Sequence, residues 1–206
     1  MQVVSINNVD YQRVLEKAIE VLKSGGVIAY PTETTYGLGC DPRNHAALDR
    51  IYRLKERDNG KALPLIACSM EQVEKLFKLT PKAKELAEEY WPGPLTLLLE
   101  PADMSLRKFM PVFKDGLTAV RVSSNQFASE LACVFGFPIV ATSANISGDP
   151  ACLSAAQVMG SFMHRESEGR PDLIVDGGEL EPSEPSTIVK FEGNDAKIVR
   201  QGAIRI

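Results

Sequence analysis

The stretch from Gly25 to Asp41 constrains the fold more than any other part of the sequence. Val27 to Tyr30 is a short, fully apolar run after a glycine pair, which is typical of a strand buried on both faces. Pro31 should end this strand, because proline lacks the amide hydrogen that a sheet ladder needs. Three threonines, a glutamate and a tyrosine then crowd into the six residues from Pro31 to Tyr36. Such a segment is either a ligand-binding loop beyond a strand end or a turn rich in hydroxyl caps.

Composition describes an ordinary α/β protein with a weak overall charge. The chain has 206 residues and is 44% hydrophobic, so a single domain over residues 1–206 is expected. The net charge of −4 excludes a global basic field of the kind that nucleic-acid-binding proteins carry, although a local basic patch stays open.

Cysteine and histidine spacing gives no sign of a metal site. The cysteines and histidines are widely separated: Cys40, Cys68, Cys133, Cys152, His45 and His164. We expect the cysteines to be reduced and mostly buried rather than zinc ligands or disulfide partners. Neither a signal pattern nor an apolar run of membrane-spanning length is present, so the prediction is a cytoplasmic protein without membrane contact.

Helical and strand patterns alternate along the chain. Helices are predicted near 11–24, 45–54, 70–77, 80–90, 125–135 and 155–163, and strands near 3–6, 27–30, 63–68, 95–99, 117–122, 138–142, 173–176, 186–191 and 197–200. Residues 101–116 read as an irregular surface segment. The alternation favours a twisted, mixed sheet with flanking helices, because the last strands follow one another closely.

The segment from Arg53 to Lys61 reverses the local sign of charge. Lys55 and Arg57 would point in different directions on a continuing helix, so they can serve one site only if the helix ends near Glu56. Asn59 and Gly60 supply suitable termination chemistry. The alternative is a solvated helix end whose cations complement the helix dipole.

Ser143 and Asn145 follow a predicted strand with only one alanine between them. In extended backbone they face the same side and could offer a hydroxyl and an amide to one ligand. The alternative is a turn completed by Ser147 and Gly148. Arg121 lies within an apolar strand and therefore needs either a structural carboxylate or an anionic ligand. Phosphate loops, dinucleotide fingerprints and nucleophile elbows are all missing, so a bound nucleotide would be held by side-chain cations and hydroxyls.

Together, several segments resemble the YrdC/Sua5 family, in order and over nearly the whole chain: Pro31–Gly39, Lys55–Arg57, Trp91–Thr96, Ala119–Val122, Thr142–Gly148, Ser186–Ile188 and Arg200–Gly202. The resemblance implies a YrdC-like fold with a large concave face. Thr35, Ser123 and Gln201 depart from the usual family pattern, but none of them removes a charged group of the site.

The resemblance also implies a reaction, in which L-threonine, bicarbonate and ATP give L-threonylcarbamoyladenylate and pyrophosphate. ATP is a substrate of this nucleotidyltransferase, and Mg²⁺ would share the pyrophosphate charge. A partner transferase complex would pass the threonylcarbamoyl group to a tRNA adenosine beside the anticodon.

By the same resemblance, Lys55, Arg57, Ser143 and Asn145 carry catalysis. The residues implied for ATP are Lys55, Arg57, Lys61, Ser143 and Arg200, and those implied for threonine are Thr32, Arg121, Ala141 and Ser186. An RNA-binding module for tRNA or double-stranded RNA, without chemistry, is the alternative, although the acidic composition disfavours strong nonspecific binding. A carbamoyl-adenylate-forming domain of the hydrogenase-maturation type ranks last, because such domains sit in longer chains with zinc-finger motifs.

Overall fold

A computed structural model describes residues 1–7, 10–57, 62–166 and 169–206. The helices of this part are α1 (Tyr11–Lys23), α2 (His45–Leu54), α3 (Met70–Leu76), α4 (Pro81–Tyr90), α5 (Leu106–Phe109), α6 (Gln126–Phe135) and α7 (Ala155–Phe162). Its strands are β1 (Gln2–Ser5), β2 (Ile28–Pro31), β3 (Tyr36–Gly39), β4 (Leu65–Ala67), β5 (Phe77–Lys78), β6 (Leu95–Pro101), β7 (Thr118–Val122), β8 (Ile139–Val140), β9 (Thr142–Ser143), β10 (Leu173–Asp176), β11 (Thr187–Glu192) and β12 (Asp195–Arg200).

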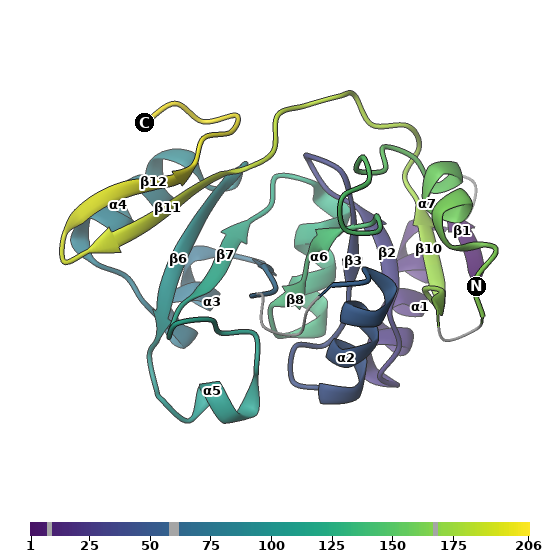
Figure 1. Cartoon of the computed structure of the whole chain (residues 1–206), viewed down its shortest axis with the longest axis horizontal. Helices are drawn as coiled ribbons and strands as arrows, with labels where there is room; N and C mark the ends of the chain where they lie inside the picture. The colour runs from purple at the N-terminus through teal and green to yellow at the C-terminus, as the bar shows by residue number, and fades with distance from the viewer. Residues whose placement is uncertain (8–9, 58–61, 167–168) are drawn as a thin grey trace.

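Two mixed sheets stand side by side (Figure 1). In the described residues, one sheet has five strands in the order β1-β10-β2-β3-β9, and the other has seven, in the order β12-β11-β6-β7-β4-β8 with β5 paired to β6. Parallel pairs such as β1 with β10 and β4 with β7 alternate with antiparallel pairs such as β2 with β3. The predicted mixed α/β class is confirmed, while the expected single sheet is divided into two.

The crossing from one sheet to the other is shortest at Ala141. The predicted strand 138–142 is split there, since β8 belongs to the seven-stranded sheet and β9 to the five-stranded sheet. Ala141 donates its backbone N–H to Pro64 O at 2.8 Å, so the crossing residue is itself tied to the start of β4. A longer connection from β10 to β11 passes over the space between the sheets (Figure 1).

Helix boundaries follow from local capping chemistry. Asn44 and Asn125 accept hydrogen bonds from the third residues of α2 and α6, and Ser69, Thr80 and Ser154 do the same for α3, α4 and α7. Gly136 ends α6 in the left-handed conformation with φ of 76°. Local side chains and one glycine therefore set the bounds of these helices.

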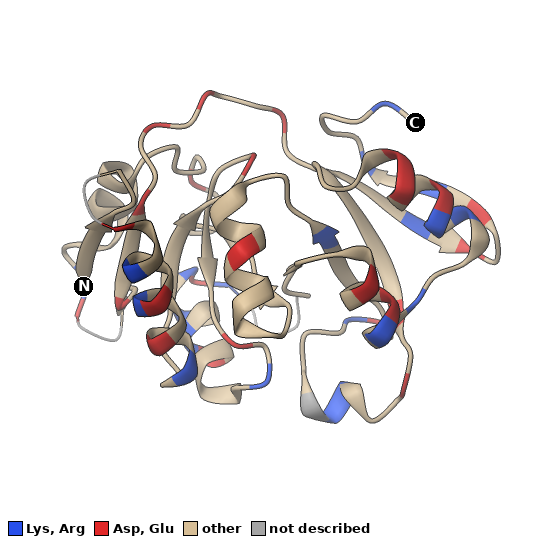
Figure 2. Ribbon diagram, turned by 180° about the vertical axis from the view of Figure 1, so that it is seen from behind, with Lys and Arg blue, Asp and Glu red and all other residues tan. Residues whose placement is uncertain are grey.

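Two apolar clusters stabilise the fold. One lies between α1, α6 and the strands β2 and β10, and it includes Leu15, Leu22, Phe127 and Leu131. The other gathers side chains from α2, α4 and the seven-stranded sheet. Figure 2 shows that charged residues lie mainly on the helices and loops, whereas most central strands carry few. In the described part of the chain, no helix combines the length and hydropathy that crossing a bilayer requires.

Three expectations differ from the structure. Pro31 lies inside β2, opposite Tyr36, because the chain turns back at once and Tyr36–Gly39 forms a strand that the sequence analysis missed. Residues 101–116 contain the short helix α5, and Met110 and Val112 in this segment are buried.

The expectation of reduced cysteines is wrong for one pair. Cys68, just after β4, is joined by a disulfide to Cys133 of α6, and their Cα atoms lie 4.9 Å apart. The pairing arises because α6 packs against β4, which brings together residues that are 65 positions apart. Cys40 and Cys152 are free and buried, as expected.

Candidate functional site

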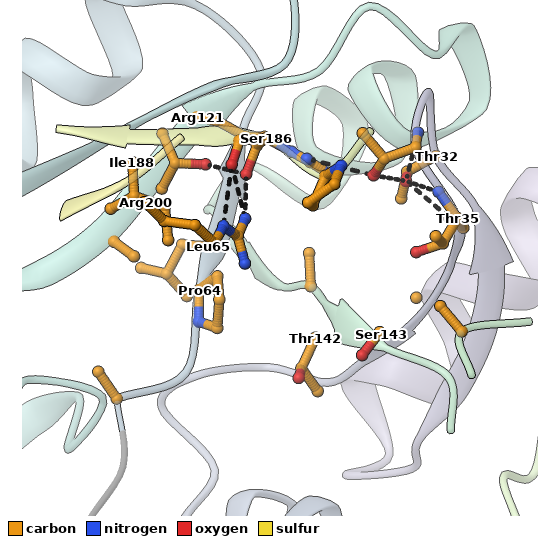
Figure 3. A pocket seen from close by; sticks show the side chains of 18 of the residues that line it. Thr32, Thr35, Pro64, Leu65, Arg121, Thr142, Ser143, Ser186, Ile188 and Arg200 are labelled. Atoms are coloured by element: carbon orange, nitrogen blue, oxygen red, sulfur yellow. Dashed lines mark hydrogen bonds between the residues drawn. The ribbon is translucent and has the colours of Figure 1, made fainter. Parts of the chain in front are cut away.

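A cavity of about 590 Å³ lies between the two sheets (Figure 3). Both sheets line it: Thr32, Gly37 and Ser143 come from the five-stranded sheet and its turn, and Leu65, Thr96, Arg121, Ser186, Ile188 and Arg200 come from the seven-stranded sheet and its connections. Arg57, Ala62, Pro64 and Lys114 complete one side. The large concave face that the resemblance implies therefore corresponds to a real cavity.

The charge of the lining is one-sided. Four cationic residues contribute to it, namely Arg57, Lys114, Arg121 and Arg200, and none of the described residues that line it is acidic. This contrasts with the net charge of −4 of the whole chain. A cleft lined by one sign of charge concentrates ligands of the opposite sign, so the cavity is suited to an anionic ligand.

Arg57 reaches this cavity because α2 ends where the sequence analysis required. Lys55 is the cap residue, and Glu56 takes the left-handed conformation with φ of 47°. Glu56 N–H donates to Arg53 O at 3.2 Å and Arg57 N–H donates to Tyr52 O at 3.0 Å, which is the bonding pattern of a Schellman motif. The chain thus turns before Asn59, Gly60 and Lys61, which lie outside the described residues.

Lys55 does not line the cavity but lies directly behind Ser143. Its ammonium group is within hydrogen-bond distance of Ser143 O at 2.5 Å, Asn145 O at 3.0 Å and Asn145 Oδ1 at 3.0 Å, and the residue is only 3% exposed. Burial, together with the nearby charge of Arg57, lowers the pKa of Lys55 to about 8. Lys55 is therefore committed to holding the Ser143–Asn145 segment.

Asn145 completes this arrangement. Ser143 Oγ donates to Asn145 Oδ1 at 2.6 Å, and Asn145 Nδ2 donates to Asp149 O at 2.5 Å. Ser147 N–H also donates to the backbone oxygen of Lys55 at 2.9 Å. Of the residues in this segment, only Ser143 reaches the cavity, whereas Asn145 is buried beside Lys55. The structure thus brings Lys55, Ser143 and Asn145 together, with one of them facing a ligand.

The threonine-rich segment is a tight turn between β2 and β3. Thr32 Oγ1 donates to Thr35 O at 2.6 Å and accepts from the backbone N–H groups of Thr34 and Thr35 at 3.3 and 3.2 Å. The turn with hydroxyl caps is therefore present, and Thr32, Thr34 and Thr35 also line the cavity, so the ligand-binding interpretation stays a prediction.

Arg121 has the structural carboxylate that its buried position demanded. Its Nε lies 3.3 Å from Glu33 Oε1, and both side chains are only 11% exposed. Ser123 Oγ donates a short hydrogen bond to the other oxygen of Glu33, and Arg121 Nη1 donates to Thr34 Oγ1 at 3.4 Å. Of the two partners considered for Arg121, the carboxylate is therefore present, and Arg121 still lines the cavity.

Ser186 and Arg200 form the opposite wall (Figure 3). Arg200 donates to Ser186 O at 2.7 and 3.1 Å and to Ser186 Oγ at 3.0 Å, and Thr96 Oγ1 donates to the same hydroxyl at 2.8 Å. Partial burial and the charge of Arg121 lower the pKa of Arg200. Ala141, the crossing residue, lines the cavity as well.

Sequence reasoning missed Glu33, Thr96 and Lys114 as members of this site. Lys114 carries a readable signal, because Asp115-Gly116 is typical of a tight hairpin turn that brings its flanking residues together. Glu33 was noticed only as part of a polar loop.

The donor set does not suit a resident magnesium ion. Mg²⁺ prefers carboxylate oxygens, and none lines the described part of the cavity. Within the described ranges, no group of three or more metal-binding side chains occurs elsewhere either. The described lining therefore offers no carboxylate ligand for a resident magnesium ion.

Comparisons with known proteins identify the family of the chain. The family model Sua5_yciO_yrdC, described as "Telomere recombination", matches residues 20–202. A threonylcarbamoyl-AMP synthase from Psychromonas ingrahamii is 38% identical over 192 residues, covering 92% of this chain and 97% of the relative. One from Chromohalobacter salexigens is 40% identical over 179 residues, covering 86% and 92%.

Among solved structures, Sua5 of P. abyssi complexed with L-threonine superposes with a TM-score of 0.85 at 32% identity. The match covers 98% of this chain and 58% of that chain, so this chain spans little more than half of that protein. The family model matches most of this chain, and the two synthases named above align with 86% or more of it. The chain therefore belongs to the Sua5/YciO/YrdC family.

Proposed function

We propose that this protein is an L-threonylcarbamoyladenylate synthase, formed by a single domain over residues 1–206. The observation that carries the proposal is a cavity whose described lining has four cationic and no acidic residues and includes a threonine-rich turn. Nucleotide phosphates and the carboxylate of an amino acid are both anions of the kind such a cavity favours. Relatives that cover nearly all of this chain bear the name of the same activity, which supports the proposal.

The chemistry needs positioning and charge stabilisation more than a strong nucleophile. Threonine and bicarbonate first give a carbamate and water. A carbamate oxygen then attacks the α-phosphorus of ATP, the bond from this phosphorus to the bridging oxygen breaks, and pyrophosphate leaves. Negative charge gathers on phosphate oxygens during this nucleotidyl transfer, so preorganised donors lower its barrier.

The residues divide into two groups for this reaction. Arg57 and Ser143 face the cavity, and we assign them to the phosphate groups, with Arg200 as a further nucleotide contact. Lys55 and Asn145 act by positioning Ser143, because their polar atoms are bonded to that segment. Lys61 remains an ATP-binding prediction from the sequence. Magnesium bound to the nucleotide substrate would supply further neutralisation of the phosphate charge.

The threonine site is assigned to the turn and the wall beside it. Arg121 is the cation nearest to this turn, and it can take the carboxylate of the amino acid while Glu33 holds it in place. Thr32, Ala141 and Ser186 line the same cavity. A site built from hydroxyls is expected to prefer a hydroxy amino acid over an apolar one of similar shape.

The decisive experiment incubates the purified protein with ATP, labelled bicarbonate and threonine and detects the adenylate by mass spectrometry. Label should appear in threonylcarbamoyl-AMP, together with stoichiometric pyrophosphate, and valine should give far less product than threonine. Salt-dependent RNA binding without pyrophosphate release would instead support the RNA-binding alternative. Transfer of the product to tRNA would then be tested by adding a tRNA-modifying transferase complex.

A further inference from the structure

We propose that Lys114 is a further phosphate-binding residue of this cavity and that it acts together with Arg57 on the charged tail of the nucleotide. The inference rests on the proposed function, since it names a contact for the nucleotide of that reaction. Lys114 is exposed and lines the cavity, so it lies at the mouth rather than in the interior.

A hairpin turn fixes the backbone of Lys114. Lys114 and Leu117 exchange both backbone hydrogen bonds, at 2.8 and 2.9 Å, and the two residues between them, Asp115 and Gly116, have φ of 52° and 83°. Two central residues with positive φ define the type I′ turn of a two-residue hairpin. Arg107 of α5 donates to Gly116 O at 3.1 Å and so holds the turn from the other side.

Lys114 and Arg57 line the same cavity from different segments of the chain. Leu65 of β4 lies opposite Val120 of the parallel strand β7, and Ala62 and Pro64, just before β4, line the cavity together with Lys114, just before β7. Arg57 donates to Ala62 O at 3.3 Å, while Lys114 pairs with Leu117 across the turn. The segments that precede β4 and β7, which are neighbouring strands of one sheet, thus bring Arg57 and Lys114 to one cavity.

Charge pairing distinguishes Lys114 and Arg57 from the other two cations of the cavity. Arg121 is already paired with Glu33, and Arg200 is bonded to Ser186. Neither Lys114 nor Arg57 forms an ion pair with any residue that the structure describes. A flexible ammonium and a planar guanidinium with no carboxylate partner in the described ranges suit a polyphosphate, which offers oxygen atoms in several directions.

A solvated surface lysine is the alternative, and Lys108 provides the matched control. Lys108 lies on α5 in the same segment, is exposed and does not line the cavity. The affinities of wild type, Lys114→Ala, Lys114→Arg and Lys108→Ala for pyrophosphate, ATP and threonine would be measured by calorimetry at low and moderate salt. Lys114→Ala should weaken pyrophosphate and ATP binding about five- to tenfold, with a smaller salt dependence, and should leave threonine binding unchanged.

Lys114→Arg should keep most of the phosphate affinity, and Lys108→Ala should behave as wild type. Equal pyrophosphate affinities for Lys114→Ala and Lys108→Ala would overturn the inference, as would a parallel loss of threonine binding. A wild-type protein that binds pyrophosphate but makes no adenylate would refute the proposed function instead, so the two failures can be told apart.

Discussion

The Thr32–Thr35 turn and the Ser143–Asn145 segment are neighbours on opposite sides of β3, yet they are held in different ways. Both are rich in hydroxyl or amide groups, and both line the cavity. The turn is satisfied from within, because the Thr32 hydroxyl bonds to residues two and three positions away. The Ser143–Asn145 segment is satisfied by the ammonium of Lys55, which is 88 to 90 residues distant in sequence.

This difference teaches how each segment responds to change. A locally bonded turn keeps its shape when a remote residue is altered, because its donors and acceptors belong to the turn itself. A segment that one buried cation holds in place loses several hydrogen bonds at once when that cation is removed or loses its proton. Changes at Lys55 should therefore disturb the Ser143–Asn145 segment, whereas the Thr32–Thr35 turn should be disturbed only by changes within the turn itself.

The largest effect is expected for Lys55→Ala. This change removes the donor for three oxygen atoms at once, so Ser143 is released and turnover should fall about a hundredfold or more. Ser143→Ala should also reduce turnover severely, because it removes the hydroxyl that faces the cavity. Adenylate formation measured with Lys17→Ala, an exposed change on α1, serves as the control. Near-normal rates for both variants would show that this segment is not the reaction centre.

The next largest effect is expected at alkaline pH, which should weaken the bonds that hold the Ser143–Asn145 segment but not those within the Thr32–Thr35 turn. As the pH rises through about 8, Lys55 loses a proton and a neutral amine can no longer donate to three oxygens, so kcat/KM should fall up to tenfold per unit. The pKa of Lys55 is lower in the folded protein than its usual 10.5, so the unfolded chain binds more protons in this window. The contribution of Lys55 to the free energy of unfolding therefore rises between about 8 and 10.5.

The variant Lys55→Arg provides the check on this assignment. A guanidinium does not titrate in this range. The variant should therefore have a lower kcat/KM than wild type, but this value should stay constant over the pH range in which that of wild type falls. An identical decline in both proteins would assign the titration to another group.

A smaller effect is expected for Thr32→Val, which tests the turn. Valine cannot donate to Thr35 O or accept from the two backbone N–H groups, so threonine affinity should fall about three- to tenfold. Calorimetric titration with threonine measures this, and Lys55→Ala should show the opposite pattern, with turnover lost more than threonine affinity. Unchanged threonine affinity in Thr32→Val would remove this residue from the amino acid site.

The smallest effect is expected at Glu56, between Lys55 and Arg57. Its left-handed backbone conformation costs about 1 kcal/mol for a residue other than glycine. Its ion pair with Arg165 is partly exposed and stabilises the fold by less than this amount. Glu56→Gly should therefore keep activity within about twofold and exceed Glu56→Ala in the free energy of unfolding by about 1 kcal/mol. Urea unfolding of the two variants measures this difference, and equal stabilities would contradict a strained turn.

Local chemistry explains what the sequence could predict. Helix caps such as Asn125 and Gly136 act within a few residues, so their patterns are readable without a structure. The approach of Arg57 to a common site was likewise predicted on the condition that α2 ends near Glu56, and it does.

What could not be predicted depends on packing between distant segments. The strand β3 was hidden because two of its four residues are glycines, which propensity disfavours in strands. The partner of Arg121, the disulfide of Cys68 and the burial of Lys55 all depend on which elements meet. Residue spacing in the sequence does not predict which of these distant segments come into contact.

The crossing at Ala141 has a consequence for motion. Only one residue separates the strand that belongs to one wall of the cavity from the strand that belongs to the other. Relative movement of the walls would therefore act on the φ and ψ of that residue and on its 2.8 Å bond to Pro64 O, as well as on the bonds that Val140 forms with Cys40 and Tyr30. Hydrogen exchange at this single amide would measure how often its bond to Pro64 O opens, and a ligand that bridges the two walls should slow the exchange.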